Sequence, residues 1–352
     1  MRMKSTFLIF TLIATIIIGC KPKEEPITTE VEETEEEEVA KYETTGTIEV
    51  VSPKLHDLIP KGNQLEIIAE GFGWSEGPLW VPSQNMLLFT DIPPNKIVKW
   101  TEENGAELYL TPAGYTGEEE RGGEVGANGL ILDSDGNLVL CQHGNRQMAK
   151  MDAPLDQPAP NYIAIADNYD GKKFNSPNDA TYKSNGELYF TDPPYGLEKN
   201  MDDPSKEIPF QGVYKADAEG NVVLLTDELT RPNGIAFSPN EKILYVANSD
   251  PDKAIWMAYD VKEDGTIENG RVFYDATDNS KAGEKGLPDG LKIDNMGNIF
   301  ATGPGGVWIF TDEGEHLGTL KTGQATSNCA FNEDKSVLYI TADMYLMRIN
   351  LK

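Results

Sequence analysis

Short apolar segments alternate with polar turns along most of this chain, and one clear unit begins at Asp289. It runs Asp289-Gly290-Leu291-Lys292-Ile293, turns through residues 294–297, and continues as Asn298-Ile299-Phe300-Ala301-Thr302. Apolar residues at every second position are typical of half-buried β-strands, and a glycine-containing turn between two such runs is typical of a hairpin. The pattern therefore predicts two antiparallel strands joined by a tight turn.

This unit occurs six times, at a spacing of roughly 40 to 55 residues. The copies open at Glu76, Asn128, Asn178, Asn233, Asp289 and Asn328. Third apolar segments follow most copies, at residues 96–100, 212–215, 254–260, 306–310 and 346–351. Small antiparallel sheets repeated in this way are arranged radially in a β-propeller. We therefore predict an all-β fold, a six-bladed β-propeller.

The ends of the repeat region predict how the ring closes. The last copy runs out of chain after its third strand, whereas an unpaired apolar strand at residues 64–69 precedes the first copy. We expect this N-terminal strand to complete the last blade, because a closed ring leaves few strand edges exposed.

The N-terminus carries a targeting pattern. A basic start at residues 1–4 precedes an apolar run at residues 5–18, which is too short to span a bilayer comfortably and is typical of a secretory signal. The run ends Ile17-Ile18-Gly19-Cys20, which resembles the lipobox of bacterial lipoproteins. We expect a signal peptide over residues 1–19 and a lipidated Cys20 that anchors the protein at the outer membrane or in the periplasm. An uncleaved signal anchor is the alternative.

Residues 20–60 are expected to form an acidic disordered tether between the anchor and a propeller over residues 61–352. No basic residue lies between Lys23 and Lys41, and Glu35 to Glu38 form a continuous acidic run. Blocks of like charge repel each other and stay solvated, so they are typical of extended tethers. A sorting signal or a partner-binding tail is the alternative.

Charge and cysteine content exclude several function classes. The chain has 58 acidic and 30 basic residues, a formal net charge of −28, which argues against nucleic acid or anionic lipid as partners. Contact with a membrane is therefore expected only through the anchor, and the protein is expected to be a monomer or a weak oligomer. Cys141 and Cys329 fall in strands of different copies, so we expect buried free thiols. The histidines and cysteines are too far apart for a recognisable zinc motif.

The six residues that open the copies are the main chemical signal. Each stands where an inner strand begins, so all six side-chain oxygens should meet at one mouth of the central channel. Carboxylates and amides brought together without His or Cys suit a hard divalent cation. The simpler alternative is that Asn-Gly and Asp-Gly pairs only make turns. That alternative does not account for Glu76, or for the proline that precedes Asn178, Asn233 and Asp289 in register.

Five segments resemble, in the same order, the signature segments of the gluconolactonase family, which includes senescence marker protein 30 and the luciferin-regenerating enzymes. They are Glu76-Gly77-Pro78-Leu79-Trp80, Asn175-Ser176-Pro177-Asn178-Asp179, the segment from Tyr189 to Gly196, Arg231-Pro232-Asn233-Gly234 and Pro288-Asp289-Gly290. The resemblance extends from about residue 65 to the C-terminus. It implies a six-bladed propeller with one divalent cation in its central pocket.

The resemblance also implies site roles. Glu76, Asn233 and Asp289 match the family's metal ligands, Asn178 matches either a fourth ligand or a substrate contact, and Asp289 matches the proposed general base. Asn128, His143, Tyr195 and Asn328 are candidates for contacting substrate, although His143 fits a satisfied core histidine equally well. Ser176 stands where the animal branch has an arginine that contacts the sugar acid, which leaves the lactone open.

Together these features predict a metal-dependent hydrolase that opens a sugar lactone. The cation, Ca²⁺ first and Mg²⁺, Mn²⁺ or Zn²⁺ otherwise, would polarise the carbonyl while Asp289 activates water. Two alternatives remain: a related metal-dependent hydrolase of phosphotriesters or aryl esters, and a non-catalytic lipoprotein that binds carbohydrate or protein.

Overall fold

The computed structural model describes residues 41–352 as one unit. The expected signal peptide, Cys20 and the part of the tether up to residue 40 lie outside the described residues. Within residues 41–352, no helix is both long enough and apolar enough to cross a bilayer.

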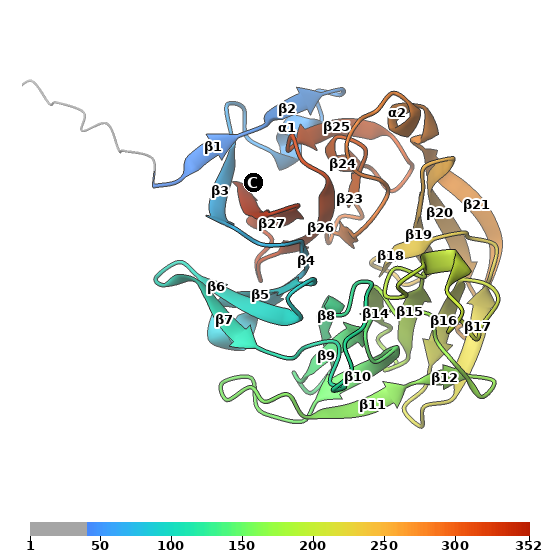
Figure 1. Cartoon of the computed structure of the whole chain (residues 1–352). Coiled ribbons are helices and arrows are strands. Elements are labelled where there is room, and N and C mark those ends of the chain that lie inside the picture. Colours follow the sequence, from blue (N-terminus) through green and yellow to red (C-terminus); the bar gives the residue numbers. More distant parts are fainter. Residues whose placement is uncertain (1–40) are drawn as a thin grey trace, which may run out of the picture. The chain divides into compact units, whose positions relative to one another are not determined.

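Six antiparallel sheets surround a central channel, as Figure 1 shows, which confirms the predicted six-bladed β-propeller. Each sheet is one blade. From its innermost strand outward, blade 1 contains β4 (Ser75–Val81), β5 (Met86–Asp91), β6 (Lys96–Thr101) and β7 (Gly105–Leu110). In the same direction, blade 2 contains β8 (Ala127–Leu132), β9 (Leu138–Gln142), β10 (Gln147–Met151) and β11 (Tyr162–Ala166). Blade 3 contains β14 (Ala180–Tyr182), β15 (Leu188–Asp192), β16 (Gly212–Ala216) and β17 (Val222–Thr226).

The second half of the chain repeats this plan. Blade 4 contains β18 (Pro232–Phe237), β19 (Ile243–Asp250), β20 (Lys253–Val261) and β21 (Ile267–Asp275). Blade 5 contains β22 (Leu291–Ile293), β23 (Ile299–Gly303), β24 (Gly306–Phe310) and β25 (His316–Lys321). Blade 6 contains β26 (Thr326–Phe331), β27 (Val337–Ala342), β28 (Tyr345–Asn350) and β3 (Leu65–Glu70). Outside the blades lie the β12–β13 ribbon (Asn168–Tyr169 and Lys172–Lys173), α1 (Leu55–Leu58) and α2 (Thr277–Lys281).

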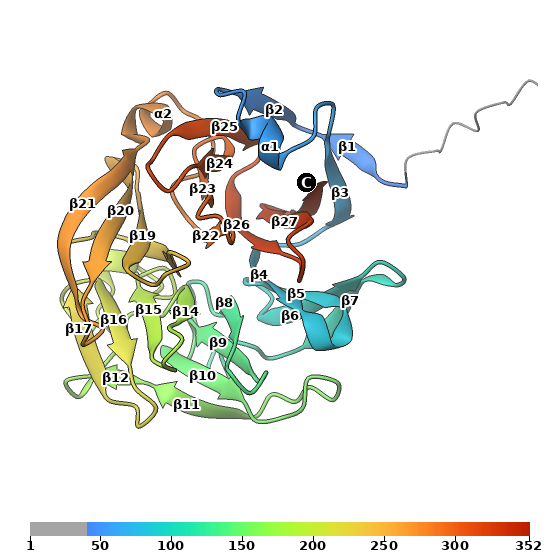
Figure 2. The same ribbon diagram turned by 180° about the vertical axis from the view of Figure 1, so that it is seen from behind.

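The ring closes as the sequence predicts. The N-terminal strand β3 pairs antiparallel with β28, the last strand of the chain, so blade 6 contains both ends of the repeat region. Figure 2 shows the same closure from behind. Because blade 6 joins residues far apart in the sequence, its pairing holds the whole ring shut.

The N-terminal segment before β3 is ordered, which corrects the expected tether boundary near residue 60. β1 (Glu43–Thr45) adds to the outer edge of β3 in blade 6, and β2 (Thr47–Val50) adds to the outer edge of β25 in blade 5. Gly46 joins the two strands with a φ of +66°, where a Cβ would lie 2.1 Å from the Lys321 carbonyl oxygen. This segment, the strap, therefore joins two neighbouring blades, and residues 43–50 belong to the propeller.

Apolar side chains fill the spaces between neighbouring blades. One cluster joins Leu55 and Ile59, just after the strap, to Val307 and Ile309 of blade 5 and Leu338 of blade 6. The full burial of these side chains favours the propeller by the hydrophobic effect. Cys141 and Cys329 are buried free thiols, as predicted.

His316 is half-buried in β25. Its ring stacks on Trp308, with centroids 4.5 Å apart, and Nε2 lies 3.0 Å from the Thr319 hydroxyl. Burial lowers the pKa of His316. It is a packing residue on the outer side of blade 5.

Candidate functional site

The six residues that open the copies, termed the ring residues, are directed inward by irregularities in the inner strands. The register of the inner strand shifts beside Glu76 in β4, between Ala127 and Leu130 in β8, and between Pro232 and Ile235 in β18. A β-bulge bends the strand and changes the direction of a side chain. In blades 3 and 5 the ring residues stand just before the short inner strands, where the Asn178 and Asp289 amides donate to Thr191 and Thr302.

The glycines that follow the ring residues are required by close packing between blades. A Cβ on Gly234 would lie 2.2 Å from the Asp289 carbonyl oxygen, and one on Gly129 would lie 2.8 Å from the Asn178 carbonyl oxygen. A Cβ on Gly290 would lie 1.9 Å from the Asn328 side chain. None of these three has a positive φ. The Asn-Gly and Asp-Gly pairs therefore do not make left-handed turns, and the turn alternative is wrong at these positions.

A pocket of about 280 Å³ opens at the end of the channel where the inner strands begin. It is lined by the ring residues Glu76, Asn128, Asn178, Asn233 and Asp289, and by Trp74, Glu124, Tyr195, Ser249, Gly286, Leu287, Ala325 and Thr326. Five of the six ring residues thus reach one cavity. The sixth, Asn328, does not line it: its Nδ2 donates to Glu76 at 3.1 Å and its Oδ1 accepts from the Cys329 amide at 2.9 Å.

The amide of Asn233 is held with its oxygen free. The Ser249 hydroxyl donates to the Pro288 carbonyl, so that hydroxyl must accept from Asn233 Nδ2, which lies 2.9 Å away. A hydroxyl has one proton to give, so this network fixes which end of the amide faces Ser249. Asn233 Oδ1 is left buried without a hydrogen-bond donor.

Asn178 shows the same arrangement on another blade. Its Nδ2 lies 3.3 Å from His143 Nε2, and its Oδ1 is buried without a donor. His143 is fully buried and does not line the pocket. Its Nδ1 lies 3.3 Å from a Glu124 carboxylate oxygen, close enough for a charge interaction, but the two groups make no hydrogen bond. An imidazole that accepts at Nε2 carries its proton at Nδ1, facing Glu124. His143 therefore orients Asn178 and is not placed to touch substrate.

Asn128 contributes a third buried carbonyl oxygen without a donor. A buried, unpaired polar oxygen costs free energy unless a ligand or an ion satisfies it. Three such oxygens, on three different blades, line the same pocket.

Three carboxylates also line the pocket, and two of them, Glu76 and Asp289, are ring residues. Glu76 is 1% exposed, and burial, with a further contribution from Asp179, raises its pKa to about 8. Asp289 is partly exposed to the pocket, and burial followed by the Glu76 and Asp179 charges raises its pKa well above the ordinary value. A nearby cation would favour the ionised form of both groups.

Within residues 41–352, no three His, Cys, Asp or Glu side chains gather closely enough to hold a metal on their own. The ring residues of this pocket instead supply two carboxylates and three amide oxygens, and amide oxygens are ligands that Ca²⁺ accepts in proteins. The residues present therefore fit a hard cation held partly by neutral oxygens.

The other predicted contacts separate into two groups. Tyr195 lines the pocket, with its hydroxyl 3.5 Å from the Ser249 carbonyl oxygen. Ser176 is fully buried; its hydroxyl donates to the Pro193 carbonyl at 2.5 Å and accepts from the Gly196 amide at 2.9 Å. Ser176 thus shapes the turn that carries Tyr195. Arg121 donates to the backbone carbonyls of Gly144 and Gly196.

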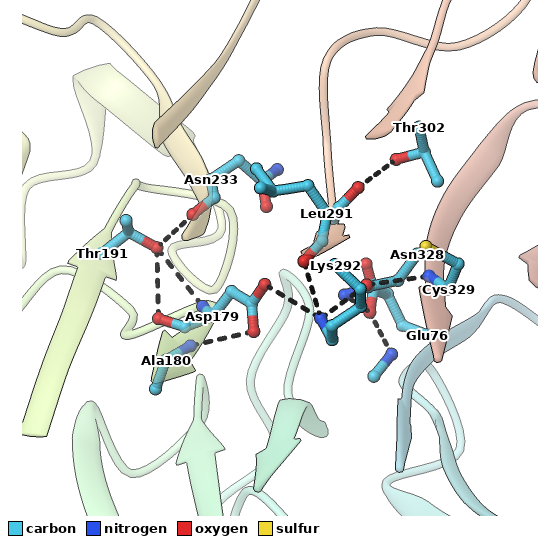
Figure 3. Close-up of polar contacts among 12 residues, drawn as sticks. Glu76, Asp179, Ala180, Thr191, Asn233, Leu291, Lys292, Thr302, Asn328 and Cys329 are labelled. Atoms are coloured by element: carbon cyan, nitrogen blue, oxygen red, sulfur yellow. Dashed lines mark hydrogen bonds and ion pairs between the residues drawn. The ribbon is translucent and has the colours of Figure 1, made fainter. Parts of the chain in front are cut away.

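Sequence reasoning missed Asp179, Lys292, Ser249 and Glu124. Asp179 stands where most copies have glycine after the ring residue, and Lys292 is the only charged residue at the fourth position of the copies. An alignment of the repeats could have found both. Figure 3 shows the two side chains facing each other in the channel. Ser249 lies near the end of β19 and Glu124 in the loop before β8, both outside the repeat pattern, so they left no such signal.

Comparisons with known proteins agree with this geometry. A model of the SMP-30/Gluconolactonase/LRE-like region matches residues 74–343. A gluconolactonase of Zymomonas mobilis is 39% identical over 320 residues, covering 88% of this chain and 87% of that protein. The regucalcin of Sus scrofa is 25% identical over 289 residues, covering 78% of this chain and 85% of its own. The solved structure of a gluconolactonase from Xanthomonas campestris has a TM-score of 0.74 at 27% identity and covers 89% of this chain and 99% of that one.

The matched region contains all six ring residues and the whole pocket. This chain belongs to the SMP-30/gluconolactonase/LRE-like family.

Proposed function

We propose that this protein hydrolyses a sugar lactone in the central pocket, with a divalent cation held by Glu76, Asn178, Asn233 and Asp289. One observation carries the proposal: five ring residues from five blades line a single cavity, two of them with carboxylates and three with amide oxygens that have no hydrogen-bond donor. The 39% identity to a gluconolactonase along nearly the whole length of both chains supports the substrate class.

The donor set supports Ca²⁺ as the first choice of ion. All candidate ligand atoms are oxygens, and two of the four residues are neutral amides. The nitrogen of Asn233 already donates to Ser249, and that of Asn178 lies in contact with His143. Hard cations of this kind take carboxylate, carbonyl and water oxygens. When bound, the cation would polarise the lactone carbonyl and stabilise the negative charge that develops on its oxygen.

Asp289 is the proposed general base, because its carboxylate lines the pocket and is partly exposed there. It would take a proton from water as the water oxygen bonds to the lactone carbonyl carbon. The ring C–O bond then breaks, and the proton held by Asp289 passes to the departing ring oxygen. The product is the open hydroxy acid, and the base is restored.

The remaining pocket residues suit a small polyhydroxylated substrate. Asn128 and Tyr195 offer polar atoms on one part of the pocket wall, while Trp74, Leu287 and Ala325 offer apolar surface. A cavity of about 280 Å³ is at the small end for ligand sites, which supports a single sugar ring.

The test is hydrolysis of a panel of aldonolactones by residues 41–352, with Ca²⁺, with chelator, and with Asp289→Asn. We expect turnover that needs the cation and falls at least a hundredfold in Asp289→Asn, with Ca²⁺ affinity measured separately. Turnover that survives in Asp289→Asn would refute its role as base. Ca²⁺ binding with no turnover on any lactone, but turnover of phosphotriesters or aryl esters, would favour the second kind of hydrolase.

We also propose that the protein is lipid-anchored through Cys20 outside the cytoplasm, which rests on the sequence alone because Cys20 lies outside the described residues. Metabolic labelling with a fatty-acid probe should mark the wild-type protein and not Cys20→Ser. Equal labelling of the two proteins would refute the anchor.

A further inference from the structure

A third acid lies in the channel beside the pocket and is not part of the proposed ligand set. Asp179 follows the ring residue Asn178 and is only 3% exposed. Its Oδ1 accepts from the Ala180 amide at 2.9 Å, but its Oδ2 is buried without any hydrogen-bond donor. A buried carboxylate with an unsatisfied oxygen is costly unless an opposite charge lies close to it.

Lys292 is the cation nearest to this acid in the described structure. Its Nζ lies 4.0 Å from Asp179 Oδ2, 3.3 Å from Asn328 Oδ1 and 3.1 Å from the Leu291 carbonyl oxygen. Figure 3 shows the ammonium group between Asp179 on one side and Asn328 on the other. Asn328 in turn donates to Glu76, so Lys292 is linked to both acids on this side of the channel.

The enclosed charges of the channel can be counted. Glu76, Asp179 and Asp289 are three carboxylates, and Lys292 is the ammonium group among them. Glu124 also lines the pocket, but its side chain is 41% exposed, so solvent screens its charge and it is left out of the count. The ionised channel therefore has a net charge of −2, which one divalent cation neutralises.

We propose that Lys292 is a built-in cation that neutralises Asp179 and so sets the charge of the channel to match a single divalent ion. Lys292 is a positioning residue in this proposal. It does not line the pocket, and its link to the proposed ligand Glu76 runs through Asn328. The proposal rests on the proposed cation site, and it explains why a lysine stands in an inner strand where the other copies have uncharged residues.

Charge matching predicts opposite effects for the two partners. Asp179→Asn leaves Lys292 unpaired, so the channel charge rises from −2 to −1 and Ca²⁺ affinity should fall at least tenfold. Lys292→Met leaves Asp179 unpaired, so the charge falls to −3 and the protein should bind Ca²⁺ at least tenfold more tightly or bind a second ion. The double variant Asp179→Asn/Lys292→Met returns the charge to −2 and should bind within about threefold of wild type. These directions follow from the charge attraction between the channel and the ion.

Isothermal titration with Ca²⁺ measures these affinities and stoichiometries, with Lys292→Arg as the matched control that keeps the positive charge. A purely structural pair would weaken binding in both single variants, and such a result would overturn the proposal. A double variant no better than the weaker single variant would also overturn it.

Thermal unfolding of the metal-free protein separates this proposal from the proposed cation site. Each single variant should melt at a lower temperature than wild type, and the double variant should recover at least half of the larger loss, since no charge is then left unpaired. If wild type binds no Ca²⁺, the cation site fails while this recovery still supports the Lys292–Asp179 pair. Additive losses in melting temperature would refute the pair.

Discussion

The Ser249 hydroxyl gives the sharpest test of how the ring amides are oriented. It donates to the Pro288 carbonyl and accepts from Asn233 Nδ2 at 2.9 Å, and Ser249 is only 3% exposed. Ser249→Ala removes both bonds with little change of shape. The Asn233 amide then loses the partner that keeps its oxygen free for the cation.

The size of the effect follows from the two lost hydrogen bonds. At about 1 kcal/mol each, they amount to about 2 kcal/mol. If all of this appears in cation binding, the dissociation constant rises about thirtyfold, within the range seen when a residue that supports a metal ligand is removed. Any part of this energy that the metal-free protein loses does not appear in binding, so the loss in cation binding and the fall in the free energy of unfolding of the metal-free protein should together be about 2 kcal/mol.

The assay is calcium titration together with urea unfolding, and Thr319→Val is the matched control. Thr319 is also fully buried and also loses one hydroxyl contact, to His316, but it lies on the outer side of blade 5. We expect both variants to lose stability and only Ser249→Ala to lose affinity. Equal calcium affinities for wild type and Ser249→Ala would refute the view that Ser249 orients a ligand.

Three further predictions follow from other parts of the structure. Gly234→Ala places a Cβ 2.2 Å from the Asp289 carbonyl oxygen and should cost about 1 to 3 kcal/mol in urea unfolding, whereas Gly73→Ala, with its nearest contact at 3.3 Å, should cost less than about 0.5 kcal/mol. Burial raises the pKa of Glu76 from 4.5 to about 8, so the folded metal-free protein keeps a proton that the unfolded chain releases. The melting temperature of the metal-free protein should therefore fall as the pH rises from about 5 to 8. Glu76→Gln should show a shallower decline, because Asp289 also has a raised pKa and keeps part of it, and an unchanged slope would contradict the assignment. A protein that begins at residue 51 lacks β1 and β2 and should melt below one that begins at residue 41, since two blade edges lose their added strands; equal melting temperatures would show that the strap does not stabilise the ring.

The repeat pattern determined the architecture because it records burial directly. Alternating apolar residues marked the inner strands, and the predicted third strands at 212–215 and 306–310 match β16 and β24 closely. The unpaired strand at residues 64–69 predicted the closure with β28, since an unpaired apolar strand needs a partner. The strap was missed because residues 43–50 are mostly polar and pair only with the outer edges of two finished blades.

The sequence also located the ring residues of the pocket, because the position of a residue within each copy fixes its position around the channel. Five of the six ring residues line one cavity for that reason. Their exact roles depend on neighbours that the repeat does not encode. Asn328 and Asn178 look alike in the sequence, yet one is bonded at both ends and the other keeps a free oxygen.

What the sequence by itself determined was the number of blades, their closure and the ring of oxygen-bearing residues, since these follow from periodicity along the chain. Only the tertiary structure decided which amides are held open, which glycines are required by close contact, and that Asp179 faces Lys292. Those features depend on distances between blades, where residues more than a hundred positions apart come within 4 Å.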